Sequence, residues 1–305
     1  MKVIMKIKNI IFKSPIIAAS GTYGYGDEVK SFVDLSKIGG VITKSITLNP
    51  RLGNNSPRII ESKSGMLNSI GLANIGVEKF CSDKLPLLNK INTHFIVSVA
   101  GSEISNYIEV ISKIEQADGN HIGYEINISC PNVKEGGMSF GVDKDVTYEL
   151  TKKLREITNK ILIIKLSPNV TSITDIALAA QKGGADAVSA INTIVAMGID
   201  IETFKPKLHT TFGGLSGPAI KPIALAHVHK IFKAVNIPII GIGGISSATD
   251  VIEFILAGSD LVQVGTLNYR NPNIAVDIFN ELKKYCVKNK IDCISDLKGK
   301  LKYYE

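Results

Sequence analysis

The chain has 305 residues, of which 45% are hydrophobic and 21% are charged, and this composition is typical of a soluble globular protein. No apolar run is long enough to span a bilayer and Met1–Phe12 lacks a signal-peptide pattern, so we expect a cytoplasmic protein without membrane attachment. The net charge of +7 does not predict nucleic-acid binding, because the lysines are dispersed and no aromatic residues alternate with arginines. The four cysteines have no metal-ligand spacing and form no CxxC pair, so we expect neither a metal site nor a disulfide framework: Cys81, Cys130, Cys286 and Cys293.

Eight short apolar runs alternate with longer amphipathic stretches along the chain. Their near-continuous apolar character suits parallel strands that are buried on both faces. The expected strands are Pro15–Ala19, Val41–Thr43, His94–Ala100, Tyr124–Ser129, Ile161–Leu166, Ala187–Asn192, Pro238–Ile242 and Leu261–Gly265. Eight such units predict one α/β domain over residues 1–305, a closed (β/α)8 TIM barrel, with an open doubly wound sheet as the alternative.

Helical spacing of apolar residues lies between these runs, in Val146–Lys160, Thr171–Lys182 and Pro222–Val235. Ser247 begins a further helix, with Asp250 in the place that a capping box gives to glutamate. Three connections that follow strands are longer than a barrel needs. In a barrel they form extended loops on the C-terminal face, where barrel enzymes have their sites: Ser45–Leu72, Pro131–Val142 and Thr193–Gly217.

Glycines follow the last two expected strands, at Gly241, Gly243 and Gly244 and again at Gly265, next to Thr266. Barrels often bind phosphate between these two loops, because glycine lets backbone N–H groups approach the phosphate oxygens. We therefore expect a phosphate-bearing ligand, which could be a substrate or flavin mononucleotide (FMN).

Polar side chains also lie at the ends of other expected strands. Lys44 and Lys165 are costly in apolar strands unless they have partners, and Asn127 and Asn192 stand beside them. Two cations and two amides that point inward would suit a flavin ring, whose reduced form is stabilised by positive charge. Cys130 directly follows the fourth strand, where nearby lysine charge would lower its pKa and allow it to act as a base.

Together these motifs resemble the dihydroorotate dehydrogenase family over nearly the whole chain. The resemblance is carried by Ala19–Gly21, Lys44–Ser45, Asn68–Leu72, Asn127–Asn132, Lys165, Ile191–Thr193, Gly213–Gly217, Gly243–Gly244 and Gly265–Thr266. The family's soluble class 1 enzymes use a cysteine base, which Cys130 matches, whereas its membrane-associated class 2 enzymes use serine. Four stretches look like the NAD-linked class 1B catalytic subunit: Asn132–Gly137, Ile191–Asp200, Lys205–Lys207 and Gly213–Pro218.

The resemblance implies a role for each matching residue, with Cys130 as the catalytic base. One FMN per chain would contact Ser20, Lys44, Ser45, Asn127, Lys165, Ile191, Gly217, Gly243, Gly244, Gly265 and Thr266, the last four around its phosphate. The substrate would contact Lys44, Asn68, Ser69, Ile70, Gly71, Leu72, Asn127, Asn192 and Thr193. Ser98 stands where the family often has an asparagine that contacts the flavin, and its shorter hydroxyl would make a weaker or water-mediated contact.

The implied reaction is the oxidation of (S)-dihydroorotate to orotate in pyrimidine biosynthesis, with proton loss to Cys130 and hydride transfer to FMN. In class 1B, electrons pass to NAD through a partner subunit that carries FAD and a [2Fe–2S] cluster, in a heterotetramer of two catalytic and two electron-transfer subunits. This chain has neither a GxGxxG fingerprint nor four clustered cysteines, so we expect those groups on the partner.

Four alternatives remain at this point. The first is the fumarate-linked class 1A form, and the second is a barrel lyase or isomerase that uses Lys44 or Lys165 as a Schiff base. The third is the pyrimidine-reducing domain of dihydropyrimidine dehydrogenase, which belongs to a longer chain with cluster cysteines. The fourth is a non-catalytic scaffold subunit.

Overall fold

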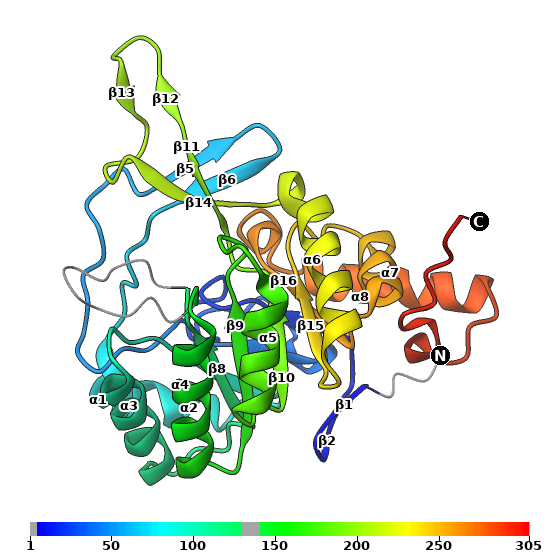
Figure 1. Ribbon diagram of the computed structural model, residues 1–305, viewed down its shortest axis with the longest axis horizontal. Coiled ribbons are helices and arrows are strands. Elements are labelled where there is room, and N and C mark those ends of the chain that lie inside the picture. The colour runs from blue at the N-terminus through cyan, green and yellow to red at the C-terminus, as the bar shows by residue number, and fades with distance from the viewer. Residues whose placement is uncertain (1–4, 130–140, 305) are drawn as a thin grey trace.

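The computed structural model describes residues 5–129 and 141–304. Eight parallel strands close into a barrel in the order β10-β15-β16-β3-β4-β7-β8-β9 (Figure 1). Their bounds are β3(Ile16–Ala18), β4(Gly40–Ile42), β7(Phe95–Val99), β8(Gly123–Asn127), β9(Ile161–Leu166), β10(Ala187–Ala190), β15(Ile239–Ile242) and β16(Leu261–Val264). All eight expected strands and the closed barrel are confirmed, and the strands are buried on both faces as their apolar character requires.

Helices surround the barrel (Figure 1). They are α1(Gly76–Lys79), η2(Phe80–Lys84), α2(Leu85–Leu88), α3(Ile104–Gln116), α4(Lys144–Ile157), α5(Ile173–Lys182), α6(Lys221–Ala234), α7(Ala248–Ala257) and α8(Ile274–Lys288). Ser247 caps α7 by accepting a hydrogen bond from the Asp250 amide at 3.2 Å, as predicted. The Asp250 carboxylate accepts from the Ser246 amide, one residue earlier than a capping box requires. No helix in the described part of the chain is long and apolar enough to cross a membrane.

Two of the three long connections contain strands that were not expected. β5(Ile59–Ser62) and β6(Gly65–Asn68) come from the first connection, and β11(Ile194–Met197) and β14(Phe212–Ser216) come from the third. They form one antiparallel sheet in the order β11-β14-β6-β5. A hairpin of β12(Ile199–Asp200) and β13(Lys205–Pro206) extends beyond this sheet (Figure 1). These strands are only partly buried, so the apolar signal that revealed the barrel strands is weak in them.

The opposite end of the barrel carries the antiparallel hairpin β1(Met5–Ile7)–β2(Ile10–Phe12) (Figure 1). Ile7 and Phe12 are fully buried, so the hairpin covers the amino ends of the barrel strands with apolar side chains. The two ends of the barrel are thus built differently, and only the carboxyl end carries the polar strand-end residues that the sequence singles out.

His121, just before β8, makes stability depend on acid pH. Its ring is 4% exposed and its Nε2 lies 2.8 Å from the Tyr124 hydroxyl. Burial, and secondarily the charge of Lys160, lowers the pKa of His121 from 6.5 to about 4. As the pH falls, His121 is therefore protonated near pH 6.5 in the unfolded chain but only near pH 4 in the folded chain. The free energy of unfolding should fall across this window, by at most about 3 kcal/mol.

The substitution His121→Gln should flatten this acid dependence, because glutamine does not titrate. Urea unfolding at about pH 7 and about pH 5 measures the change in each variant. His209→Gln is the matched control, because His209 is exposed. An acid-induced loss of stability that is equal in His121→Gln and the wild type would contradict this assignment.

Candidate active site

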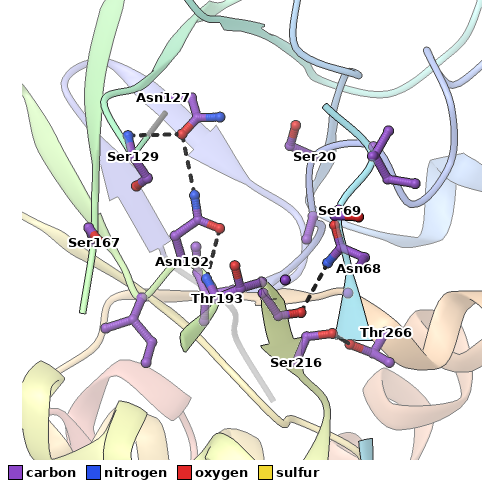
Figure 2. A pocket seen from close by; sticks show the side chains of 18 of the residues that line it. Ser20, Asn68, Ser69, Asn127, Ser129, Ser167, Asn192, Thr193, Ser216 and Thr266 are labelled. Carbon is purple, nitrogen blue, oxygen red and sulfur yellow. Dashed lines mark hydrogen bonds between the residues drawn. The ribbon is translucent and has the colours of Figure 1, made fainter. Parts of the chain in front are cut away.

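A cavity of about 740 Å³ opens at the carboxyl ends of the barrel strands, beneath the β11-β14-β6-β5 sheet. Its lining comes from the ends of the barrel strands and from the two long connections that supply the covering sheet. Figure 2 shows the polar side chains of this lining, which converge from several elements. The volume lies in the range of small-molecule and cofactor sites, and its position is the one that barrel enzymes use.

One wall of the cavity is a chain of amide hydrogen bonds. Asn127, the last residue of β8, accepts from the Ser129 amide and from the Asn192 side chain, at 3.3 Å each. The Asn192 side-chain oxygen in turn accepts from the Thr193 amide at 2.8 Å (Figure 2). Because each amide is held by another, both side chains are oriented before any ligand arrives. They can offer fixed donors and acceptors to a planar polar ring.

The segment that follows β6 forms the facing wall. Asn68 donates to the Gly214 carbonyl at 3.4 Å, which ties β6 to β14 beside the cavity (Figure 2). Gly71 has a φ of +74°, and a Cβ atom there would lie 2.7 Å from the Asn54 backbone nitrogen. The tight turn therefore needs glycine, and it keeps the backbone of Ser69–Leu72 along the cavity.

The two lysines of the cavity have different electrostatic surroundings. Lys165, near the end of β9, is 8% exposed and its ammonium lies 3.3 Å from a carboxylate oxygen of Glu125. The Lys44 ammonium has no hydrogen bond or ion pair with another described residue, although its backbone amide donates to the Gly24 carbonyl at 2.8 Å. Burial, followed by the positive charge of Arg58, lowers the pKa of Lys44 from its usual value. An anionic ligand beside Lys44 would supply the counter-charge that the described residues do not.

Backbone groups from three segments meet at the far end of the cavity. Gly244, after β15, has a φ of +70°, and a Cβ atom there would lie 2.8 Å from the Gly217 carbonyl oxygen and 3.0 Å from the Lys221 amide nitrogen. Gly265, after β16, lines the cavity, and a Cβ atom there would meet the Ala19 side chain at 3.5 Å, an ordinary van der Waals contact. The Thr266 hydroxyl donates to Ser216 at 2.9 Å (Figure 2). Such a cradle of glycines at these two strand ends suits a phosphate.

Two buried hydroxyls in the lining, those of Ser69 and Ser129, have no hydrogen-bond partner among the described residues. Buried polar groups are rarely left unpaired, so a polar ligand is the natural partner for them. These hydroxyls, the Lys44 ammonium, which has no partner among the described residues, and the glycine cradle together fit FMN and a small polar substrate. Neither ligand is part of this structure.

Eighteen of the twenty residues expected at the site line this one cavity. They are Ser20, Lys44, Ser45, Asn68, Ser69, Ile70, Gly71, Leu72, Asn127, Lys165, Ile191, Asn192, Thr193, Gly217, Gly243, Gly244, Gly265 and Thr266. Cys130, the expected base, lies outside the described residues, which end before it at Ser129.

Ser98 is the one described residue of the expected set that is not in the lining. It is fully buried in β7, and its hydroxyl lies 2.8 Å from the hydroxyl of Ser45, which does line the cavity. The serine side chain is too short to pass Ser45, so in this arrangement Ser98 reaches the cavity only through that neighbour.

Several lining residues were missed by sequence reasoning, among them Ser129, Ser167, Asn169, Val195, Phe212, Ser216 and Tyr269. Ser129 and Ser167 lie one or two residues past the barrel strands β8 and β9, so their strand-end position could have identified them. Val195 and Phe212 belong to the covering sheet, whose strands were not expected. No signal in their own sequence marks them as cavity residues.

A closed parallel barrel with a cofactor-sized polar cavity at the carboxyl ends of its strands has the architecture of a barrel enzyme. The family profile described as "Dihydroorotate dehydrogenase" matches residues 2–286. The chain belongs to the dihydroorotate dehydrogenase family.

Curated relatives agree with this family assignment, and a solved structure agrees with the fold. Proteins named "Dihydroorotate dehydrogenase B (NAD(+)), catalytic subunit" from Geotalea uraniireducens and Parabacteroides distasonis are 46% and 47% identical to this chain over 297 residues. Each match covers 97% of both chains. The crystal structure of DHODH in complex with ferulenol from Eimeria tenella is similar with a TM-score of 0.78 at 23% identity. This match covers 97% of this chain and 87% of that one, and it supports the fold.

Proposed function

We propose that this chain oxidises (S)-dihydroorotate to orotate with bound FMN, and that it works as the catalytic subunit of an NAD-linked enzyme. Membership of the family and the names of relatives that match over 97% of both chains support the activity and the link to NAD. The observation that carries the proposal is the single cavity that collects the amide wall, the two lysines and the glycine cradle.

The residues of the cavity divide between cofactor and substrate. Gly243, Gly244, Gly265 and Thr266 would hold the FMN phosphate, with Gly217 beside them. The flavin ring would contact Ser20, Lys44, Ser45, Asn127, Lys165 and Ile191. When bound, FMN supplies the hydride acceptor, which no side chain of this chain can replace.

The substrate would be held between the two polar walls. Asn127 and Asn192 would hydrogen-bond the pyrimidine ring from one side, and Asn68 with Ser69–Leu72 would do so from the other. Because these groups are held by the protein's own hydrogen bonds, they would orient the reacting C–H bonds without further ordering. Lys44 would pair with the negative charge of the substrate.

Cys130 would remove the proton from C5 of dihydroorotate as a thiolate. Loss of this proton and of the C6 hydride leaves the C5–C6 double bond of orotate. The two lysines would favour the thiolate by raising the local positive potential. The hydroxyl of Ser129, the neighbour of Cys130, is buried in the cavity lining, which supports placing the following residue near the substrate.

The electrons would leave through a partner subunit that carries FAD and a [2Fe–2S] cluster, in a heterotetramer of two catalytic and two electron-transfer subunits. The phrase "catalytic subunit" in the relatives' names supports a second kind of subunit. The described part of this chain contains no group of three or more metal-binding side chains.

An anaerobic absorbance spectrum tests the proposal. The purified protein should be yellow, and dihydroorotate should bleach the flavin band. A colourless protein would support a Schiff-base lyase or isomerase instead, and a yellow protein that dihydroorotate fails to bleach would contradict the substrate.

A second assay tests the electron acceptor. The isolated chain should not reduce NAD efficiently until the partner is added. Fumarate-dependent turnover by the isolated chain would point to the class 1A form.

A further inference from the structure

A carboxylate lies inside the barrel, below the cavity. Glu125 of β8 is fully buried, and it is not among the residues that line the cavity. One of its oxygens accepts from the Ser189 hydroxyl at 2.9 Å and from the Gln263 amide at 2.6 Å. The other accepts from the Lys165 ammonium at 3.3 Å. The four side chains come from β8, β9, β10 and β16, so the network crosses the barrel interior.

The strand geometry places Glu125 one layer beneath the amide wall. Alternate residues of a strand point to the same face, so Glu125 and Asn127 both point inward from β8. Lys165 on β9 pairs in register with Asn127, and it lines the cavity while its ammonium reaches Glu125. Glu125 is thus connected to the cavity through Lys165.

Stability alone does not explain this network. A carboxylate and an ammonium lose their hydration when they are buried, and replacing such a pair with apolar residues of similar volume is often neutral or stabilising. Barrel interiors are ordinarily filled by branched apolar side chains. The geometry instead suits orientation: Ser189 and Gln263 fix one oxygen of Glu125 and leave the other to hold the lysine. Lys44, the other cation of the cavity, has no such support among the described residues.

We propose that Glu125 is a positioning residue that holds the Lys165 ammonium at the floor of the cavity, where it supplies positive charge to the flavin ring. Glu125 itself touches neither substrate nor cofactor. This inference rests on the proposed function, because it assigns the charge held by Lys165 to the same FMN site. Positive charge near a flavin stabilises its reduced form, so the position of Lys165 should set both the flavin potential and the rate of hydride transfer.

The test is Glu125→Gln, which keeps the size of the side chain but removes the negative charge that holds Lys165. The matched control is Glu115→Gln on α3, which removes a carboxylate that pairs with Lys160 at 3.6 Å outside the cavity. Two quantities are measured in each FMN-loaded variant: the midpoint potential against a reference dye, and the single-turnover rate of flavin reduction by dihydroorotate. Thermal melting of the flavin-free proteins compares their folding.

Glu125→Gln should shift the flavin potential to a more negative value, because a lysine without its counter-ion turns away or loses its proton. The rate of flavin reduction should fall at least about tenfold, while half-saturation by dihydroorotate stays within about threefold. Glu115→Gln should match the wild type in flavin potential, in the rate of flavin reduction and in half-saturation by dihydroorotate. An unchanged potential in Glu125→Gln overturns the proposal. So does a more positive potential, which would mean that Lys165 stays in place and only the negative charge is lost.

A second variant and a measurement without substrate allow the proposal to be rejected even if the first variant or the substrate fails. If Glu125→Gln does not fold, Glu125→Asp replaces it, because aspartate keeps the charge and withdraws it from Lys165. A potential equal to that of the wild type in Glu125→Asp would overturn the proposal. The dye measurement needs no substrate, so it tests Glu125 even if dihydroorotate fails to bleach the wild-type flavin, a result that would reject only the proposed function.

Discussion

Replacing Cys130 with alanine is expected to slow flavin reduction by dihydroorotate by about 10²–10⁴-fold, because a positioned general base contributes a factor of this size. The substitution removes the only group assigned to take the C5 proton, and it leaves the amide wall and both lysines in place. Binding of dihydroorotate should therefore change much less than the rate. Stopped-flow absorbance under anaerobic conditions, with saturating dihydroorotate and a single turnover, measures the rate directly.

The control for this experiment is Cys81→Ala. Cys81 is half-buried in η2, its thiol lies 3.9 Å from the Lys113 carbonyl oxygen, and it does not line the cavity. This variant should reduce its flavin at the wild-type rate. A Cys130→Ala protein with an undiminished rate near neutral pH would reject Cys130 as the base. Cys130→Ser should retain little activity, because a serine hydroxyl is a much weaker acid than a thiol and needs a separate base.

The second large effect is expected from Lys44→Met. Lys44 lines the cavity and has no anionic partner among the described residues, so a bound carboxylate would be its counter-charge. A charge-assisted hydrogen bond contributes about 1.5–3 kcal/mol, and its loss should weaken orotate binding by roughly ten- to two-hundredfold. Titration of the flavin spectrum with orotate measures the dissociation constant. Lys37→Met is the control, because Lys37 is exposed and pairs with Asp34 at 3.2 Å.

The same lysine should make orotate binding depend on pH. Burial, and then the charge of Arg58, lowers the pKa of Lys44 in the free protein. Raising the pH removes the proton from a group whose positive charge binds the ligand. Orotate affinity should therefore fall as the pH rises, and this fall should begin below the usual lysine pKa of about 10.4. Lys44→Met should lack this step. If its pH dependence in this range equals that of the wild type, Lys44 is not the responsible group.

The apolar barrel strands could be predicted closely because burial on both faces leaves a strong local pattern. Ile161–Leu166 has the same bounds in the sequence prediction and in the structure, and the other seven strands shift by a few residues. The covering sheet could not be predicted in the same way. Its strands, such as β11 and β14, are partly exposed and pair across long sequence separations, so no local pattern reveals them.

Glu125 shows the limit of reading polar residues one at a time. A charged residue inside an apolar strand is a visible signal, and it drew attention to Lys165 but not to Glu125. The relation between them depends on the parallel pairing of β8 with β9, which brings residues 40 positions apart into contact. Ser98 is the reverse case: the resemblance suggested a flavin contact, and the packing of β7 places its hydroxyl behind Ser45.

The sequence by itself determined the barrel, the family and eighteen of the residues that line the cavity, because strand-end position and glycine spacing are local properties of the chain. Only the tertiary structure decided which groups face one another. The ion pair of Lys165, the amide chain from Asn127 to Thr193 and the sheet over the cavity all depend on contacts between distant segments. Such contacts follow from closure of the barrel, which no local pattern describes.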